Sequence, residues 1–246
     1  MRSDQLRRNR SGRARPPRRR ALPGAALGAA VAVAALTALV VARWGPLMSY
    51  DGRVARALHA HAVTHPGFTH VMRVLTDWFW DPWTMRALAA AACFWLWWRG
   101  ERRCALRIAL VTLGASALQQ GLKALVGRDR PVWPDPIVSA DYSAYPSGHA
   151  LTATVVCGLL LWLVPRGAPR RFAWTAAALA ALSVLGVGFT RIYLGVHWFS
   201  DVVAGWLLGG VLVALAVLTA PGGAGGAGGA CSGRSPASPR ADCPAR

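Results

Sequence analysis

Acidic side chains are scarce in this chain. Only ten of its 246 residues are Asp or Glu, whereas 54% of the residues are apolar. A soluble domain of this size usually carries several times more carboxylates, because about a quarter of its residues are charged and both signs are mixed. The shortage therefore argues against a water-soluble globule and in favour of a membrane protein.

Positive charge is plentiful but concentrated at one end. Nine of the 28 basic residues lie in the first twenty positions, in "MRSDQLRRNRSGRARPPRRR", so this tail supplies a large share of the formal net charge of +18. The tail has no aromatic residue and little to bury, which predicts a disordered cytoplasmic segment drawn to anionic lipid headgroups. Binding of nucleic acid by the tail is the minor interpretation, and no nucleic-acid partner is expected.

Six mostly apolar stretches predict an all-α polytopic membrane protein with six transmembrane helices, since a span needs about 17 to 25 such residues. The stretches are 21–42, 84–98, 104–122, 148–164, 172–190 and 199–219. The first is longer than the apolar core of a signal peptide, so it is interpreted as an uncleaved span. The predicted organisation is a disordered tail over 1–20, a membrane domain over 21–220, and a second disordered tail over 221–246, which is rich in Gly, Ala and Pro.

Arginine-rich segments set the expected orientation. The amino-terminal tail, residues 99–107 and residues 165–171 are basic, and six alternating spans place all three on one side. By the positive-inside rule that side is the cytoplasm, together with both termini. Segments 123–147 and 191–198, which hold most of the unusual polar residues, then lie on the extracytoplasmic face. The reversed orientation is the alternative.

Lysine is almost absent. Lys123 is the only lysine beside 27 arginines, and it precedes Arg130 by seven positions in "KALVGRDR". A compact ammonium group kept in a chain that otherwise uses guanidinium groups indicates a chemical need at this position. A lysine that extends its amine from the end of a span towards water is the bland alternative.

The fourth stretch begins with an unusual start, "YPSGHA". Pro146 ends the preceding loop, Ser147 can cap a helix, Gly148 permits close approach to the backbone, and His149 stands on the first turn. Free amides at a helix start, with the positive end of the helix dipole behind them, form an anion site. An ordinary serine cap with an incidental histidine is the alternative.

The segment "RIYLGVHWFSD", residues 191–201, leads into the sixth stretch. Arg191 lies at the end of the fifth span, and His197 and Asp201, four residues apart, are expected to share a face of the following helix. An aspartate one turn from a histidine can accept the proton of one ring nitrogen and leave the other nitrogen with its lone pair, which prepares a nucleophile. A buried pair that only joins helices is the alternative.

These residues are all expected at one membrane face, at the ends of the third to sixth spans. Ionisable groups at membrane depth are costly and rarely kept without a partner or a function. Three cations, two histidines, a carboxylate and a helix start together predict a socket for a phosphate group, with a nucleophile and a proton donor beside it.

The motifs resemble the three-part signature of the type 2 phosphatidic acid phosphatase (PAP2) superfamily. The matching residues are Lys123 with Arg130-Pro131, Pro146-Ser147-Gly148-His149, and Arg191 with His197 and Asp201. The resemblance covers about residues 45–219. It departs from the common family pattern at Thr190, where a serine is usual, and the hydroxyl is kept.

The resemblance implies a membrane phosphatase that hydrolyses lipid phosphate or diphosphate esters without a metal or other cofactor. It implies that His197 attacks phosphorus and forms a phosphohistidine, that Asp201 orients His197, and that His149 protonates the leaving oxygen. The phosphate oxygens would be held by Lys123, Arg130, Ser147, Gly148 and Arg191. Between the two histidines, the nearby aspartate favours His197 as the nucleophile.

Four further histidines, including His61 and His65, lie between the first two spans. His61 and His65 could share a helical face as metal ligands, but no Cys or Glu nearby completes a set, so no metal site is expected. Their segment is interpreted as an amphipathic stretch lying against the membrane. Arg128 and Asp129 flank the first motif and are open to pairing with a headgroup, with motif residues, or with neither.

Several functions remain open at this stage. Candidate lipid substrates are undecaprenyl diphosphate, phosphatidic acid and phosphatidylglycerol phosphate, because the motifs describe a phosphate site and not a tail. A lipid phosphotransferase would use the same phosphohistidine. A membrane binding or transport protein would need the cations but not a polarised histidine.

Overall fold

The computed structural model describes residues 18–140, 142–165 and 167–220, and within these ranges all regular structure is helical. The predicted tails lie outside these residues, apart from 18–20, which open the first helix. The helices are α2 (Arg18–Val41), α3 (Gly45–Thr64), α4 (Pro66–Val74), the π-helical η1 (Leu75–Phe79), α5 (Pro82–Trp98), α6 (Arg102–Val126), α7 (Gly148–Leu163), α8 (Arg170–Tyr193) and α9 (Phe199–Leu218).

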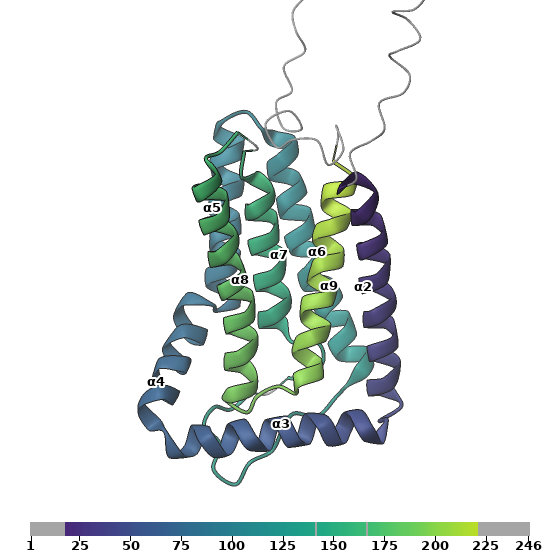
Figure 1. The fold of residues 1–246 in the computed structure, drawn as a ribbon, viewed down its shortest axis with the longest axis vertical. Helices are drawn as coiled ribbons and strands as arrows, with labels where there is room; N and C mark the ends of the chain where they lie inside the picture. The colour runs from purple at the N-terminus through teal and green to yellow at the C-terminus, as the bar shows by residue number, and fades with distance from the viewer. Residues whose placement is uncertain (1–17, 141, 166, 221–246) are drawn as a thin grey trace, which may run out of the picture.

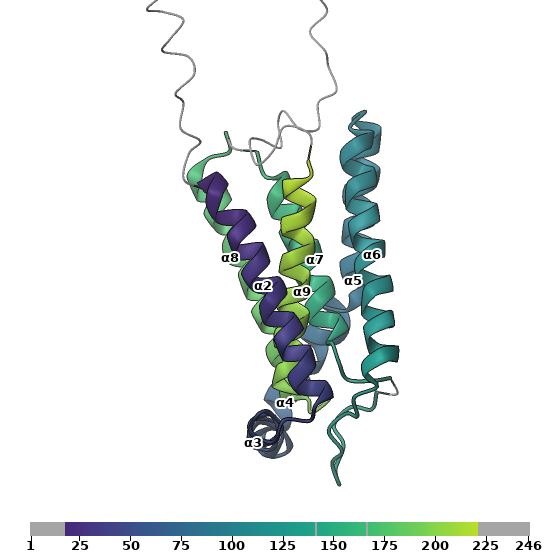
Figure 2. The ribbon, with the colours of Figure 1, turned by 90° about the vertical axis from the view of Figure 1, so that its right-hand side faces the viewer.

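The bundle consists of α2, α5, α6, α7, α8 and α9, which run along the long axis of the molecule (Figures 1 and 2). The all-α prediction is confirmed, and each of these helices overlaps a predicted span. Among the described residues, α2, α6, α8 and α9 contain spans long and apolar enough to cross a membrane, while α7 is apolar but shorter. Crossing by α5 and α7, and with it the count of six, therefore stays a proposal.

The ends of the helices follow local rules. Proline occupies the first turn of α3, α4 and α5, where its missing N–H costs no hydrogen bond. The carboxylate of Asp81 accepts hydrogen bonds from the amides of Trp83 and Thr84 and so caps α5. Helix α6 ends at Gly127, whose φ of 57° is the left-handed conformation that stops a helix.

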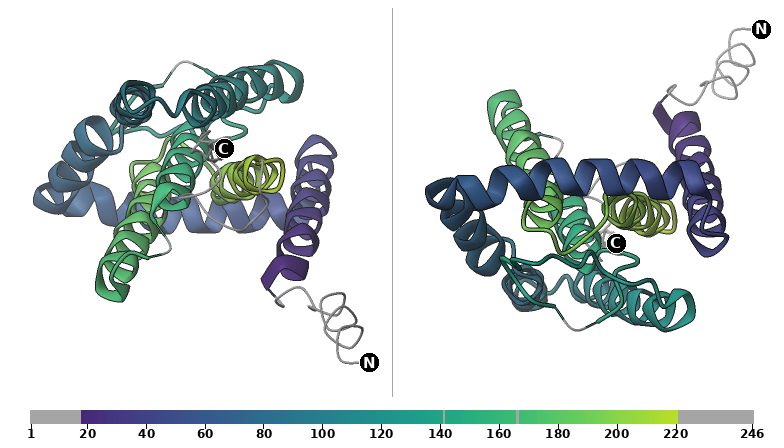
Figure 3. Two further views of the ribbon diagram at one scale, coloured as in Figure 1. Left: turned by 90° about the horizontal axis from the view of Figure 1, so that it is seen from above. Right: turned by 90° about the horizontal axis from the view of Figure 1, so that it is seen from below.

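Helix α3 lies across one end of the bundle, below the ends of α2, α8 and α9 in Figure 1 and across them in Figure 3. Its buried face includes Asp51, Ala55, His59 and Ala62, which recur at helical spacing. The other face is exposed, as the amphipathic interpretation of this segment predicted. A buried aspartate on a surface helix needs a partner, and its partner lies in the site described below.

Helices α7 and α9 pack closely through two glycines of α9, Gly205 and Gly209, which are four residues apart. A Cβ atom on Gly205 would lie 2.7 Å from the backbone oxygen of Ser147, and one on Gly209 would lie 2.7 Å from the Cβ of Thr154. Small residues at this spacing let two helix backbones approach in a membrane. The contact at Gly205 holds the first turn of α7 against α9.

This contact predicts different outcomes for two glycine substitutions on one helix. Gly205→Ala should destabilise the fold by about 1 to 3 kcal/mol, because the new methyl group meets backbone that cannot rotate away. Gly210→Ala is the matched control, since a Cβ atom there meets no atom within 4 Å. Thermal unfolding in detergent should show a lower Tm for Gly205→Ala only. Equal Tm values would contradict the packing role.

Candidate active site

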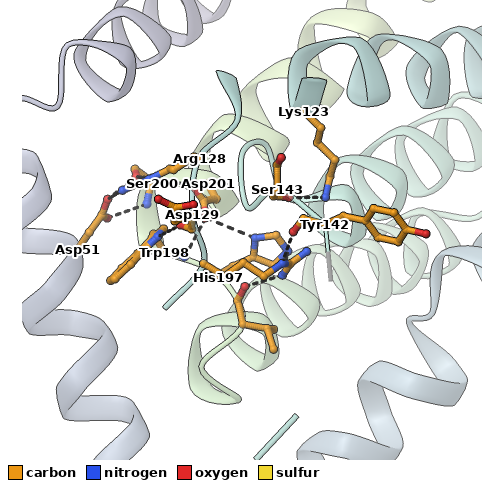
Figure 4. Close-up of polar contacts among 12 residues, drawn as sticks. Asp51, Lys123, Arg128, Asp129, Tyr142, Ser143, His197, Trp198, Ser200 and Asp201 are labelled. Carbon is orange, nitrogen blue, oxygen red and sulfur yellow. Dashed lines mark hydrogen bonds and ion pairs between the residues drawn. The ribbon is translucent and has the colours of Figure 1, made fainter. Parts of the chain in front are cut away.

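The predicted site residues meet at the end of the bundle that α3 crosses. Lys123 lies in the last turns of α6, His149 in the first turn of α7, and Arg191 in the last turn of α8. Two connections complete the site: residues 127–147 between α6 and α7, and residues 194–198 between α8 and α9. Figure 4 shows how the residues of these segments meet around His197 and Asp201.

His197 does not lie on a helix, so one detail of the sequence prediction is wrong. Helix α9 begins at Phe199, and His197 belongs to the preceding turn. Gly195, with φ of 72°, reverses the chain after α8, and the amides of Val196 and His197 both donate to the carbonyl of Arg191. The turn ends where Asp201 Oδ2 accepts a hydrogen bond from the amide of Trp198 at 2.9 Å.

The histidine and the aspartate nevertheless form the expected pair. His197 Nδ1 lies 3.4 Å from Asp201 Oδ2, and both side chains are buried. On the other side of the ring, Arg130 Nη1 lies 3.4 Å from His197 Nε2. A guanidinium group can only donate, so Nε2 must be the acceptor and carry the lone pair. Nδ1 then carries the proton and points it at Asp201.

The surroundings keep this imidazole neutral. Burial lowers the pKa of His197 well below its usual value, and the positive charges of Arg130, Arg191 and Lys123 lower the pKa further. A neutral ring with its lone pair at Nε2 is the form that can act as a nucleophile.

The three predicted cations surround His197, and two of them are held by loop carbonyls. Lys123 Nζ donates to the carbonyl of Ser143 at 2.6 Å. Arg130 donates to the carbonyls of Tyr142 and Val196. A phosphate binding between these cations would replace neutral carbonyl partners with charged oxygens, which form stronger hydrogen bonds.

Arg191 is placed differently from the other two cations. Its side chain is buried, and its one hydrogen bond to a side chain is a long contact of 3.4 Å with Thr76 Oγ1. Arg191 Nε has no hydrogen-bond partner among the described residues. A buried guanidinium N–H without a partner is costly, and an anion in the site would satisfy it.

The start of α7 contributes backbone as well as side chains. Ser147 lies at the expected cap position, but its side chain makes no capping bond, and its buried Oγ has no partner among the described residues. The amide of Ser147 instead donates to the carbonyl of Asp201 at 3.0 Å, which ties the two helix starts together. A Cβ atom on Gly148 would lie 2.5 Å from the terminal amide of Gln119, so a larger residue there would have to displace that side chain.

His149 shares this electrostatic environment. The cations whose charges act on its ring are Arg191, Arg130 and Lys123. The structure therefore brings the eight predicted site residues together, and their roles stay a prediction. The eight residues are Lys123, Arg130, Ser147, Gly148, His149, Arg191, His197 and Asp201.

Two charged residues that were not assigned a role lie beside this group. Arg128 Nη1 donates to Asp201 Oδ1 at 2.6 Å, and Arg128 Nη2 donates to Asp51 Oδ2 at 2.7 Å. Asp51 also accepts hydrogen bonds from the amide and the hydroxyl of Ser200. The one sequence feature that pointed to Arg128 was its position between Lys123 and Arg130 of the first motif. Asp51 gave no signal, because 77 residues separate it from Arg128.

The other histidines do not assemble a metal site. His61 and His65 stack with their ring centroids 3.8 Å apart, and His61 Nδ1 lies 3.0 Å from the hydroxyl of Tyr193. In the part of the chain that the structure describes, no group of three or more His, Cys, Asp or Glu side chains could hold a metal ion.

Comparison with known proteins finds a family that this geometry resembles. Residues 104–222 match the model of the PAP2 superfamily, and this range holds the eight site residues. This part of the chain is similar to PAP2 superfamily proteins. It is 42% identical over 77 residues to an undecaprenyl-diphosphatase of Sulfolobus acidocaldarius, covering 31% of this chain and 33% of that protein. It is 31% identical over 103 residues to phosphatidylglycerophosphatase B of Bacillus subtilis, covering 40% of this chain and 49% of that protein.

The fold has a solved counterpart. The chain matches the crystal structure of a transmembrane PAP2 type phosphatidylglycerolphosphate phosphatase from Bacillus subtilis with a TM-score of 0.67 and 23% identity, covering 78% of this chain and 93% of that one. The match shows the same fold, and four helices among the described residues are long and apolar enough to cross a membrane. The residues that match the PAP2 model begin within α6, so Asp51 on α3 lies outside them.

Proposed function

We propose that this protein hydrolyses a lipid phosphate or diphosphate ester through a phosphohistidine, without a metal ion. The observation that carries the proposal is the His197 and Asp201 pair, whose lone-pair nitrogen Nε2 faces Arg130. A site that only binds phosphate needs cations but gains nothing from a histidine oriented in this way. The match of residues 104–222 to the PAP2 superfamily model supports the same reaction class. The chain spans 33% and 49% of the lengths of the two curated relatives named above.

In the first step, His197 Nε2 attacks phosphorus in line with the bond to the lipid oxygen. His149 takes up a proton when the anionic phosphate binds beside it and offsets the charge of the cations. The P–N bond then forms as the P–O bond breaks, and protonated His149 gives its proton to the departing oxygen. Asp201 stabilises the positive charge that develops on the phosphorylated ring through the Nδ1–H. The leaving group is a lipid alcohol when the substrate is a monophosphate and a lipid monophosphate when it is a diphosphate.

In the second step, neutral His149 takes a proton from water, and the resulting hydroxide attacks phosphorus. The P–N bond breaks, its electron pair returns to Nε2, and inorganic phosphate leaves. Lys123, Arg130 and Arg191 stabilise the charge on the three equatorial oxygens in both transition states. In many phosphoryl-transfer enzymes a Mg²⁺ ion supplies that stabilisation.

The site faces the extracytoplasmic side in this proposal. The start of α6 at Arg102 and the start of α8 at Arg170, which belong to the two basic segments, lie at the opposite end of the bundle from α3 and the site (Figure 1). This separation supports the orientation expected from the positive-inside rule. A lipid headgroup at the extracytoplasmic surface would then lie level with the start of α7.

The first experiment measures phosphate release by the purified protein in detergent with EDTA present. The three substrates to be tested are undecaprenyl diphosphate, phosphatidic acid and phosphatidylglycerol phosphate, because neither the relatives nor the motifs identify the lipid. We expect release from one lipid well above the others, unchanged by EDTA because fixed cations replace the metal. Loss of activity in EDTA that Mg²⁺ restores would contradict the metal-free mechanism. Phosphate transfer to an added acceptor lipid, without release, would indicate a transferase.

A second experiment tests the orientation. A reporter that is active only in the periplasm, inserted between residues 165 and 171, should stay inactive, because this basic segment is expected in the cytoplasm. The same reporter inserted near Val132, whose side chain is 90% exposed in the α6 to α7 connection, should be active. The opposite pair of results would reverse the topology.

A further inference from the structure

The strongest unassigned feature is the buried charge network on the far side of Asp201 from His197. Its members come from three segments: Asp51 from α3, Arg128 from the α6 to α7 connection, and Ser200 with Asp201 from α9 (Figure 4). Asp51 and Asp201 are 1% and 0% exposed, and the Arg128 side chain is 10% exposed. Such a network is too costly to bury unless its hydrogen bonds are well formed.

The two oxygens of Asp201 have different partners. Oδ1 accepts from Arg128 Nη1 at 2.6 Å, while Oδ2 accepts from the Trp198 amide and faces His197 Nδ1. Rotation of the carboxylate would break the contact with Arg128, so Arg128 fixes Oδ2 in the direction of His197. A carboxylate held through only one of its oxygens could still rotate about its Cβ–Cγ bond.

Arg128 is itself fixed by α3. Its second nitrogen, Nη2, donates to Asp51 Oδ2 at 2.7 Å, so the guanidinium group bridges two carboxylates. Asp51 Oδ1 accepts from the amide of Ser200 at 3.0 Å and thereby caps α9 from another helix. Without Asp51, Arg128 would form its ion pair with Asp201 alone. It would then compete with the Nδ1–H of His197 for the negative charge of the Asp201 carboxylate.

We infer that Arg128 and Asp51 are positioning residues for the proposed reaction: they hold the Asp201 carboxylate so that it orients His197 as the nucleophile. Asp51 lies outside the residues that match the PAP2 model. Helix α3 therefore contributes a positioning residue to the active site from outside the matched segment, and does not only cover the end of the bundle. The inference rests on the proposed function, and the test below separates the two.

The test compares the steady-state kinetics of Arg128→Gln and Asp51→Asn on whichever lipid the wild type hydrolyses. We expect kcat to fall about 10- to 100-fold in Arg128→Gln and up to about tenfold in Asp51→Asn, with KM changed little, by analogy with the outer groups that orient the histidine ligands of metal ions. Matched controls are Asp129→Asn and Arg53→Gln, because both side chains are exposed neighbours of the same charge type. The controls should keep the wild-type kcat.

The pH profile of kcat/KM separates positioning from a merely structural role. Removing the positive charge of Arg128 should move the acid limb to higher pH, because His197 and Asp201 both become easier to protonate. Removing the negative charge of Asp51 should move the limb to lower pH. The groups facing His197 that stay constant across these variants are Lys123 of α6, His149 of α7, Arg191 of α8, Asp201 of α9 and Arg130.

Three outcomes would overturn the inference. The first is a wild-type kcat in both Arg128→Gln and Asp51→Asn. The second is a loss of stability in these variants while the pH profile of kcat/KM does not move. The third is a shift of the acid limb in the same direction in both variants. If Arg128→Gln does not fold, Arg128→Lys is used instead, because it keeps the charge but cannot bridge both carboxylates. Arg128→Lys should lower kcat without moving the profile, and a wild-type kcat would contradict positioning.

A readout that needs no turnover keeps the two proposals distinguishable. A folded wild type that releases no phosphate from any lipid contradicts the proposed function. The ¹⁵N shifts of the His197 ring then report whether Nδ1 carries the proton, as the Asp201 contact requires. Loss of this tautomer in Arg128→Gln and Asp51→Asn would support the positioning role, and its retention in both would overturn it.

Discussion

Replacing His197 with alanine is expected to lower phosphate release by roughly 10⁴- to 10⁶-fold, the range seen when an enzyme loses a nucleophile that works as part of a unit. The remaining cations and helix start still bind phosphate, so substrate binding should persist while turnover stops. Comparison of kcat and KM for the purified variant, on the lipid that the wild type prefers, measures the effect.

The control for this substitution is His70→Ala. His70 is exposed on α4 and far in sequence from the motifs, so its loss should leave turnover unchanged. Rapid quenching with ³²P-labelled substrate adds a direct observation, since a phosphohistidine is stable in alkali and labile in acid. Wild type should form this label and His197→Ala should not. A label that persists in His197→Ala and is lost in His149→Ala would exchange the roles of the two histidines.

The helices that carry the motifs could be predicted from the sequence because their causes are local. Long apolar runs, a Pro-Ser-Gly start and an Asp four residues after a histidine are all short-range patterns. The predicted starts at 148 and 199 coincide with those of α7 and α9. The helical position of His197 was wrong because Gly195 permits a left-handed turn, which delays α9 until Phe199.

The network behind Asp201 could not be predicted in the same way. Asp51 is 149 residues from Ser200 and 77 residues from Arg128, and only the placement of α3 across the bundle end brings them together. No periodicity or motif spacing encodes such a contact. An aspartate on an amphipathic helix becomes informative only when its burial is known, and the burial of Asp51 is visible only in the structure.

The loop carbonyls that accept hydrogen bonds from Lys123 and Arg130 could not be predicted from the sequence either. The sequence indicates that Lys123 and Arg130 could bind phosphate, because charge and spacing suffice for that prediction. It does not indicate that the carbonyls of Ser143 and Tyr142 already accept their hydrogen bonds. The α6 to α7 connection therefore carries Arg130 and also supplies backbone carbonyls. These carbonyls accept hydrogen bonds from the buried Lys123 and the partly buried Arg130 in place of water.

The second large effect is expected from Asp201→Asn. In the Ser-His-Asp triad the corresponding Asp-to-Asn change lowers kcat about 10⁴-fold by favouring the wrong histidine tautomer, and we expect a loss of similar order here. An asparagine whose NH₂ group replaces Oδ2 would present donors to His197 Nδ1 and to the Trp198 amide. The ring would then protonate Nε2, and the lone pair would point away from phosphorus.

The alternative rotamer of the introduced asparagine does not rescue the site. With the NH₂ group in place of Oδ1, its donors would face Arg128, which can only donate. Either rotamer leaves donors opposed in a buried place, so some loss of stability should accompany the loss of kcat. Asp129→Asn makes the same chemical change at an exposed position and is the control for both measurements. A kcat for Asp201→Asn within about tenfold of wild type, in a protein with wild-type Tm, would show that His197 does not depend on this carboxylate for its tautomer.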